Sequence, residues 1–250
     1  MTSTRNYARI VGVILALWLA ASITASALGV FASESKHSFH APLPLGLAVL
    51  IPLAVFFAWL AVSREFRQFA LAVDVRTLTT IQAWRLGGFV FLVLYAHGIL
   101  PGAFALPAGW GDMVIGATAP LAARYLTRES GRRTGFIAWQ VLGVLDLVMA
   151  VSLGVLNSAP VRMFGQGVTT EAMSTLPLSV IPTFAVPLLM IFHLISIAQA
   201  WRWEAGAASV TEHGSPVAAS CRRTWGAAST SWRRWPAVAR KRFVPPGTPV

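Results

Sequence analysis

The sequence predicts an all-α membrane protein, a bundle of six transmembrane helices with both termini in the cytoplasm and a disordered basic C-terminal tail. Three observations predict this fold. Of the 250 residues, 56% are hydrophobic and only 12% are charged, whereas a typical soluble domain has about 25% charged residues. The mean hydropathy is +0.64. The basic residues lie between long apolar blocks and do not form one patch.

Six apolar blocks are long enough to cross a bilayer as helices. A rise of 1.5 Å per residue makes about 20 residues sufficient for a hydrocarbon core of about 30 Å. We therefore predict a transmembrane domain over residues 1–203, followed by the tail over 204–250. The predicted helices span residues 10–31, 43–62, 79–100, 108–126, 136–156 and 176–200.

The first block follows Arg5 and Arg9. A cleaved signal peptide over residues 1–27 is the alternative, because Ala25-Ser26-Ala27 matches the small-residue cleavage pattern. The apolar run is long for a signal peptide and continues past that site, which favours a membrane helix.

Charge placement predicts the orientation. With the N-terminus inside, the cytoplasmic segments hold 17 of the 20 Lys and Arg residues, and the outer loops hold only Lys36 and Arg162. Cytoplasmic loops are enriched in Lys and Arg. We therefore expect both termini to be cytoplasmic and the protein to lie in the cytoplasmic membrane.

The tail is rich in Arg and Trp, and shows no sustained helical period, so disorder is expected. Its basic and aromatic side chains are suited to contact with anionic lipids, although a solvated tail without a role is the favoured interpretation. The lipid bilayer is the expected partner and nucleic acid is not, because the basic residues form no patch on a soluble domain. The single cysteine, Cys221, excludes an intrachain disulfide.

Three polar residues share one layer of the predicted bundle. Arg85, Asp146 and His193 all lie roughly 9–15 Å from the cytoplasmic ends of their helices at 1.5 Å per residue. A charge within a membrane helix is unfavourable unless it is paired or lines a polar cavity. The cluster is thus a candidate site in a cavity open to the cytoplasm, with Asp146 and His193 carrying protons. Alternatively, an Arg85–Asp146 pair only fixes helix packing, or Arg85 extends to the interface.

His97 and Asp112 are predicted on the outer side, flanking the Leu100-Pro101 turn, where His37 and His40 could approach them. Their spacing matches no metal motif, so no metal is predicted. A haem between His97 and His193 is excluded, since their depths differ by roughly 15–20 Å.

The sixth block contains Pro177, Pro182 and Pro187. The two interior prolines free the carbonyls of Leu178 and Thr183, so we expect a kinked helix packed inside the bundle.

No catalytic or nucleotide-binding motif is present, so no cofactor is predicted, and an intramembrane enzyme ranks only third among the possible functions. Two other functions fit the sequence better. One is a transport-like membrane protein with an intramembrane polar cavity, and the other is a structural or accessory membrane protein whose buried charges only fix helix packing.

Several short motifs occur in order along the second half of the predicted bundle. They are RLGG from Arg85, Leu100-Pro101, DMVIGATAP from Asp112, Trp139 with Gly143, and IPTFAVPLLMIFHLISIAQ from Ile181. In these motifs the chain resembles a functionally uncharacterised group of bacterial multi-pass proteins of about six helices, although Gln140 stands where that group has Asn. The resemblance covers about residues 85–199 and implies a bacterial cytoplasmic-membrane location. It singles out Arg85, Asp112 and His193 without supplying an activity.

Overall fold

The computed structural model divides the chain into two units, residues 1–205 and 206–250. The structure describes residues 2–32, 43–127, 132–159, 161–164 and 167–203. The predictions for the tail, for His37 and for His40 concern residues outside these ranges. Within the described part the chain is all helical and contains no strand.

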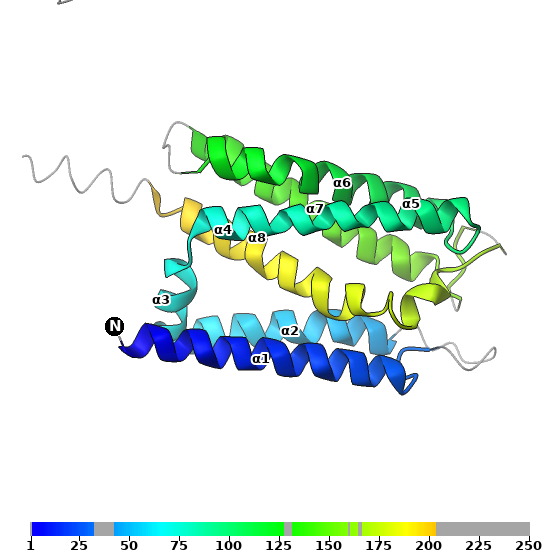
Figure 1. Ribbon diagram of the computed structural model, residues 1–250, viewed down its shortest axis with the longest axis horizontal. Coiled ribbons are helices and arrows are strands. Elements are labelled where there is room, and N and C mark those ends of the chain that lie inside the picture. Colours follow the sequence, from blue (N-terminus) through cyan, green and yellow to red (C-terminus); the bar gives the residue numbers. More distant parts are fainter. Residues whose placement is uncertain (1, 33–42, 128–131, 160, 165–166, 204–250) are drawn as a thin grey trace, which may run out of the picture. The chain divides into compact units, whose positions relative to one another are not determined.

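Eleven helical elements follow one another in the described chain (Figure 1). They are α1 (Thr2–Ala27), α2 (Leu43–Val62), α3 (Arg64–Ala72), α4 (Val75–Ile81), the 3₁₀ segment η1 (Gln82–Gly88), α5 (Phe89–Ala96), α6 (Gly102–Tyr125), α7 (Arg133–Leu156), the 3₁₀ turn η3 (Thr170–Ser174), the π-helical turn η4 (Ile181–Ala185) and α8 (Val186–Ala200).

Five helices of the described chain are long and apolar enough to cross a membrane. Two of them are composite, since α4, η1 and α5 form one span, and η4 and α8 form another. The five cover Asn6–Ala27, Leu43–Val62, Val75–Ala96, Arg133–Leu156 and Ile181–Ala200. Helix α6, the fourth of the six predicted blocks, is not among them, and its sequence explains this. Its four glycines, its two prolines and Asp112 lower its mean hydropathy.

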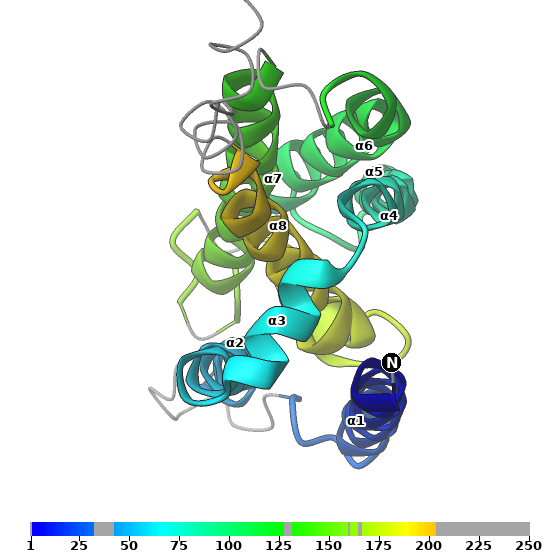
Figure 2. The same ribbon diagram turned by 90° about the vertical axis from the view of Figure 1, so that its left-hand side faces the viewer.

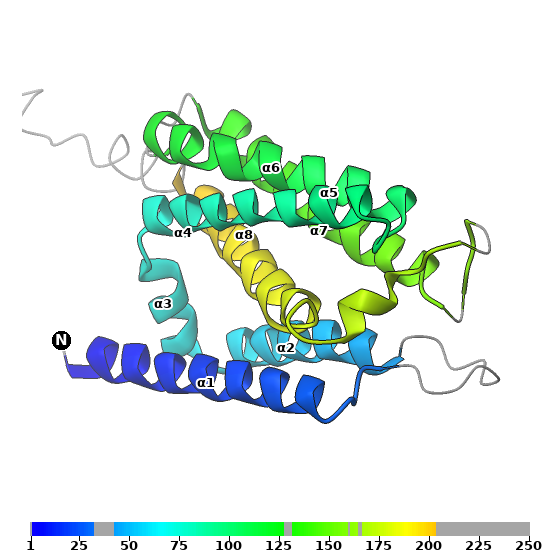
Figure 3. The same ribbon diagram turned by 45° about the vertical axis from the view of Figure 1, so that its right-hand side comes forward.

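Helix α8 is the central element of the described unit. It packs against α7, α4, α2 and α3. Figure 2 shows α8 in the middle, with α1 and α2 on one side and α4 to α7 on the other, and Figure 3 shows the same order. The helix containing His193 is therefore surrounded by others, as expected for a proline-interrupted span.

The third span changes from α-helix to 3₁₀ geometry at its middle. Side chains three residues apart lie above one another in a 3₁₀ helix. Gln82, Arg85 and Gly88 have this spacing, and they are the three buried residues of η1. Thr79, one step earlier, is also buried. The polar face of this span thus follows a period of three.

Helix α6 packs closely against this span because it presents glycines to it. A β-carbon at Gly116 would lie 2.5 Å from the Leu86 amide nitrogen, and one at Gly109 would lie 2.7 Å from the Leu92 side chain. Small residues allow helix backbones to approach in this way.

Two predicted helices end earlier than expected, because a glycine closes each of them. Gly29 (φ 73°) follows α1, and the Val30 amide donates to the Ala25 carbonyl at 3.0 Å. Gly98 (φ 68°) follows α5, and the Ile99 amide donates to Leu94 at 2.9 Å. These bonds satisfy terminal carbonyls and stop the helix. The predicted ends at residues 31 and 100 lie beyond these helix ends.

The segment between the predicted helices 43–62 and 79–100 contains a helix, α3, which lies across the long helices (Figure 1). Ser63 caps it by accepting a hydrogen bond from the Phe66 amide at 3.1 Å. Arg67 donates to the Leu60 and Ala61 carbonyls at 3.0 and 2.9 Å. Arg67 of α3 therefore satisfies two of the C-terminal carbonyls of α2, which have no amide partner within their own helix.

The last span begins at Ile181 and not at residue 176. Pro182 lies in the π-helical turn η4 and has no N–H to donate to the Leu178 carbonyl. That carbonyl accepts instead from the Ile181 amide at 3.0 Å. The Ser179 hydroxyl donates to Ser26 at 2.9 Å, which connects this segment to α1.

Candidate functional site

Arg85 is at the centre of a buried polar cluster. It lies in η1, and its side chain is only 1% exposed. Its Nε donates to Asp112 Oδ1 of α6 at 2.7 Å, and its Nη2 pairs with Asp146 Oδ2 of α7. The guanidinium thus joins three helices. The snorkelling alternative is excluded, because the side chain lies inside the protein.

Arg85 also contacts the last span. Its Nη1 donates to the Gly143 carbonyl at 3.1 Å and lies 3.3 Å from His193 Nε2. A guanidinium only donates, so His193 Nε2 must accept. The proton of this histidine is then on Nδ1, which faces Gln140 Oε1. His193 is therefore a neutral imidazole with a defined tautomer.

From His193 the hydrogen bonds continue in one direction. With its Oε1 on His193, Gln140 presents its amide nitrogen to Thr79 Oγ1 at 3.3 Å. The Thr79 hydroxyl donates to the Val75 carbonyl at 2.7 Å. We call Arg85, His193, Gln140 and Thr79 the polar file. Each member donates to the next, because Arg85 at its head cannot accept. His193, Gln140 and Thr79 are fully buried.

Three glycines make the space for three of these polar side chains. A β-carbon at Gly88 would overlap Asp112, one at Gly111 would overlap Asp146, and one at Gly143 would overlap the His193 ring. Each glycine belongs to a helix facing the polar residue. The helix backbones therefore approach most closely at the positions where the buried polar side chains lie.

The structure brings together Arg85, Asp146 and His193, which the sequence predicts in one layer. It adds Asp112, which the sequence groups with His97 on the outer side. The structure differs from this grouping, since Asp112 contacts Arg85. The reason is that α6 begins at Gly102 and not at residue 108. Asp112 is consequently ten residues, or about 15 Å, inside the helix. His97 is exposed at the end of α5. No group of potential metal ligands occurs among the described residues.

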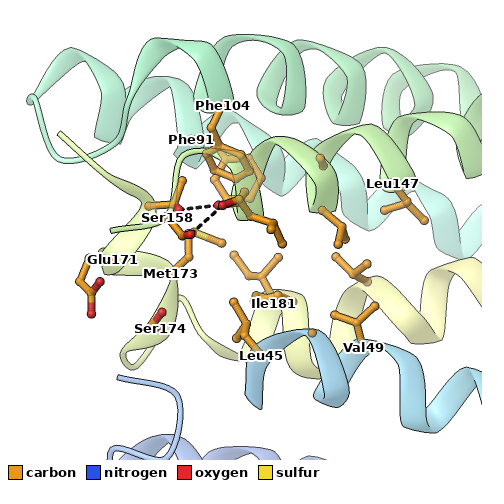
Figure 4. A pocket seen from close by; sticks show the side chains of 18 of the residues that line it. Leu45, Val49, Phe91, Phe104, Leu147, Ser158, Glu171, Met173, Ser174 and Ile181 are labelled. Atoms are coloured by element: carbon orange, nitrogen blue, oxygen red, sulfur yellow. Dashed lines mark hydrogen bonds between the residues drawn. The ribbon is translucent and has the colours of Figure 1, made fainter. Parts of the chain in front are cut away.

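A mainly apolar cavity adjoins the cluster, and its empty space of about 810 Å³ includes space open to solvent. Figure 4 shows Phe91 and Phe104 on one side of it and Leu45 and Val49 on the other. The lining includes Asp112 but not Arg85, Asp146 or His193.

The position of this cavity differs from the expectation. Its lining comes mainly from the start of α2, the first half of α6, the second half of α7, and η3 and η4, with Phe91 of α5 and Val186 of α8. This is the end of the bundle opposite the start of α1, where the sequence predicts the outer side. The sequence predicts instead a cytoplasmic cavity lined by Asp146 and His193.

Sequence reasoning did not assign a place in the cluster to Gln140 and Thr79. A signal was present. Thr79, Gln82, Arg85 and Gly88 have a period of three, and Gln140, Gly143 and Asp146 have the same spacing on α7. In an α-helix residues three apart share a face. The cavity has no comparable signal, because its lining comes from separate elements.

Comparison with known proteins identifies one family. A family model described as a domain of unknown function (DUF8737) matches residues 42–200. The match begins at α2, and so extends further toward the N-terminus than the resemblance over residues 85–199. No curated protein and no solved structure matches the chain.

Proposed function

Because the chain belongs to the DUF8737 family, which has no assigned activity, we propose its function from the geometry: a multi-pass membrane protein that binds a small, mainly apolar molecule in the cavity beside Asp112 and acts in a transport-like manner. The cavity carries this proposal. It lies among elements of four helical spans and α6, and it reaches a carboxylate that is bonded to a buried arginine.

The chemistry of the cavity suits such a ligand. Its walls are mostly aliphatic and aromatic, with few polar groups, as in small-molecule sites generally. Asp112 connects the bound molecule to Arg85, and through Arg85 to α7 and α8. Occupation of the cavity would therefore act on the contact that joins three helices.

Two elements beside the cavity have irregular helical geometry. The π-helical turn η4 contributes Ile181 and Pro182 to the lining, and η1 carries Arg85. Mid-helix 3₁₀ and π segments are frequent at functional sites and hinges. They support a change of conformation between two states of access, which transport requires.

A structural or accessory role is the second candidate. The observation in its favour is the completeness of the hydrogen bonding, since the polar file and both carboxylates are paired across four helices. Buried ion pairs of this kind can serve only to define packing.

Cysteine accessibility distinguishes the two candidates. Ala150→Cys places a thiol in the cavity, in a chain whose own cysteine is replaced by Cys221→Ser. Met149→Cys is the matched control, since Met149 is the neighbour on the same helix, is 39% exposed and does not line the cavity. We expect N-ethylmaleimide to modify the cavity thiol faster than the control thiol, which faces lipid.

Sidedness then tests transport. A membrane-impermeant thiol reagent is applied to proteoliposomes of known orientation, first outside and then inside. A transport-like protein exposes Ala150→Cys to both sides in turn. An accessory protein leaves this thiol unreactive, or reactive from one side only.

A further inference from the structure

We infer that the cavity selects an amphiphilic cation, an apolar molecule whose positive charge lies against Asp112. This inference rests on the proposed function, since it names the ligand class of the same cavity. Three observations carry it: the charges of the lining, the free oxygen of Asp112, and the charge balance of the polar cluster.

The lining has a one-sided charge. Its charged residues are Asp112 and Glu171, both acidic, and no Lys, Arg or His lines the cavity. The remaining walls are apolar apart from three hydroxyl residues, and in such surroundings the field of a carboxylate is weakly screened. The acidic side chains of the lining therefore favour a cation over an anion.

Asp112 has one oxygen available to a ligand. Its Oδ1 accepts from Arg85 Nε at 2.7 Å, while Oδ2 accepts no hydrogen bond from any described residue. The side chain is 15% exposed, and it lines the cavity. Arg85 thus orients the carboxylate from behind, so that one oxygen remains for the bound molecule.

The polar cluster has an excess of negative charge. One guanidinium, Arg85, pairs with two carboxylates, Asp112 and Asp146. The tautomer of His193 is neutral, because it accepts from Arg85. When both carboxylates are ionised, the cluster has a net charge of −1, which is unfavourable in an apolar environment. A cation in the cavity would balance it, and Asp112 is the member of the cluster that such a cation can reach.

Two ions of nearly equal size and opposite charge test the inference. Tetraphenylphosphonium is the cation and tetraphenylborate the anion. Full-length protein carrying Ala150→Cys and Cys221→Ser is placed in phosphatidylcholine nanodiscs. Each ion is added separately at increasing concentration, and the slowing of the reaction between the thiol and N-ethylmaleimide is measured as protection. Every variant is compared in identical nanodiscs, so that partitioning of the ions into lipid cancels.

We expect the phosphonium ion to protect the thiol and the borate ion not to protect it. Asp112→Asn should weaken protection by the phosphonium about tenfold or more, the loss of one charge-assisted contact. Asp146→Asn is the matched control, since it removes the same charge from the same guanidinium but at a residue outside the cavity lining. Its effect should be clearly smaller.

Equal protection by both ions would overturn the inference and leave the proposed function intact. The same holds if neither ion protects a thiol that reacts. It also holds if the phosphonium ion protects the thiol of the Asp112→Asn variant as well as it protects the thiol of the protein that retains Asp112. A cavity thiol that does not react at all would overturn the proposed function itself. The comparison of the two ions needs no change at Asp112, so it decides even if that variant does not fold.

Discussion

Arg85 and Asp146 lie 61 residues apart in the sequence and form an ion pair that joins the third span to α7. Arg85 has a second carboxylate partner in Asp112, whereas neither Asp has a second basic partner among the described residues. The three residues are therefore not equivalent, and their substitution should reveal this.

Arg85→Ala should destabilise the protein more than Asp146→Ala does. Removal of the arginine leaves two buried carboxylates without a counter-ion, and breaking a buried pair costs about 3–5 kcal/mol. Removal of Asp146 leaves Arg85 paired with Asp112. The measurement is thermal unfolding of the purified protein in detergent, with the double variant completing a cycle.

The double variant should be more stable than the sum of the single effects predicts. Arg124→Ala, an exposed arginine on α6, serves as the control and should change stability by less than about 0.5 kcal/mol. Strictly additive effects of Arg85→Ala and Asp146→Ala would show that the pair contributes nothing to stability.

Gly116→Ala should destabilise the contact between α6 and η1 by about 1–3 kcal/mol. The new β-carbon would lie 2.5 Å from the Leu86 amide nitrogen, and this backbone atom cannot move without shifting the segment that holds Arg85. Gly87→Ala is the control, since a β-carbon there would have no neighbour within 4 Å. Equal stability of the two variants in thermal unfolding would contradict close packing at Gly116.

Thr79→Val should cost about 1–2 kcal/mol, because it leaves the buried Gln140 amide without its acceptor. Thr80→Val is a matched control on the next residue. The Thr80 hydroxyl bonds only to the Arg76 carbonyl at 2.7 Å and is exposed, so its loss should change stability by less than about 0.5 kcal/mol.

The effect of Thr79→Val should also disappear in a Gln140→Leu background, where no amide needs the hydroxyl. Unfolding midpoints of the four combinations measure this coupling. If Thr79→Val and Thr80→Val were indistinguishable, or if the effect persisted without Gln140, the directional hydrogen bonding of the polar file would be refuted.

Helix α6 should cross the membrane, although its hydropathy does not identify it as a span. It packs along the third span and against α7, and Arg124 and Arg132 follow the positive-inside pattern at its end. Reporter fusions after residues 100 and 132 test this. We expect alkaline phosphatase activity at the first site and green fluorescence at the second, whereas the same reporter active at both sites would exclude a crossing.

Several features could be predicted from the sequence because they are local. A run of about 20 apolar residues is a property of consecutive positions, so α2 and the cores of the other spans were identified. Depth along a helix is also local, since it depends only on the number of residues from the helix end. This is why Arg85, Asp146 and His193 could be assigned to one layer.

Other features depend on how the helices start, end and rotate. Asp112 was grouped with His97 because six residues at the start of α6 were missed, and those residues move it by about 9 Å. Glycines at positive φ ended α1 and α5 before their apolar sequence ends. The 3₁₀ geometry of η1 places Thr79, Gln82 and Arg85 on one face.

By itself, the sequence determined the helical class, the apolar blocks and the common layer of Arg85, Asp146 and His193, since each follows from composition or from counting along one helix. Only the tertiary structure decided that Arg85 has two carboxylate partners, that His193 donates to Gln140, and that a cavity reaches Asp112. Those relationships are contacts between different helices, and they depend on which face each helix turns to its neighbour.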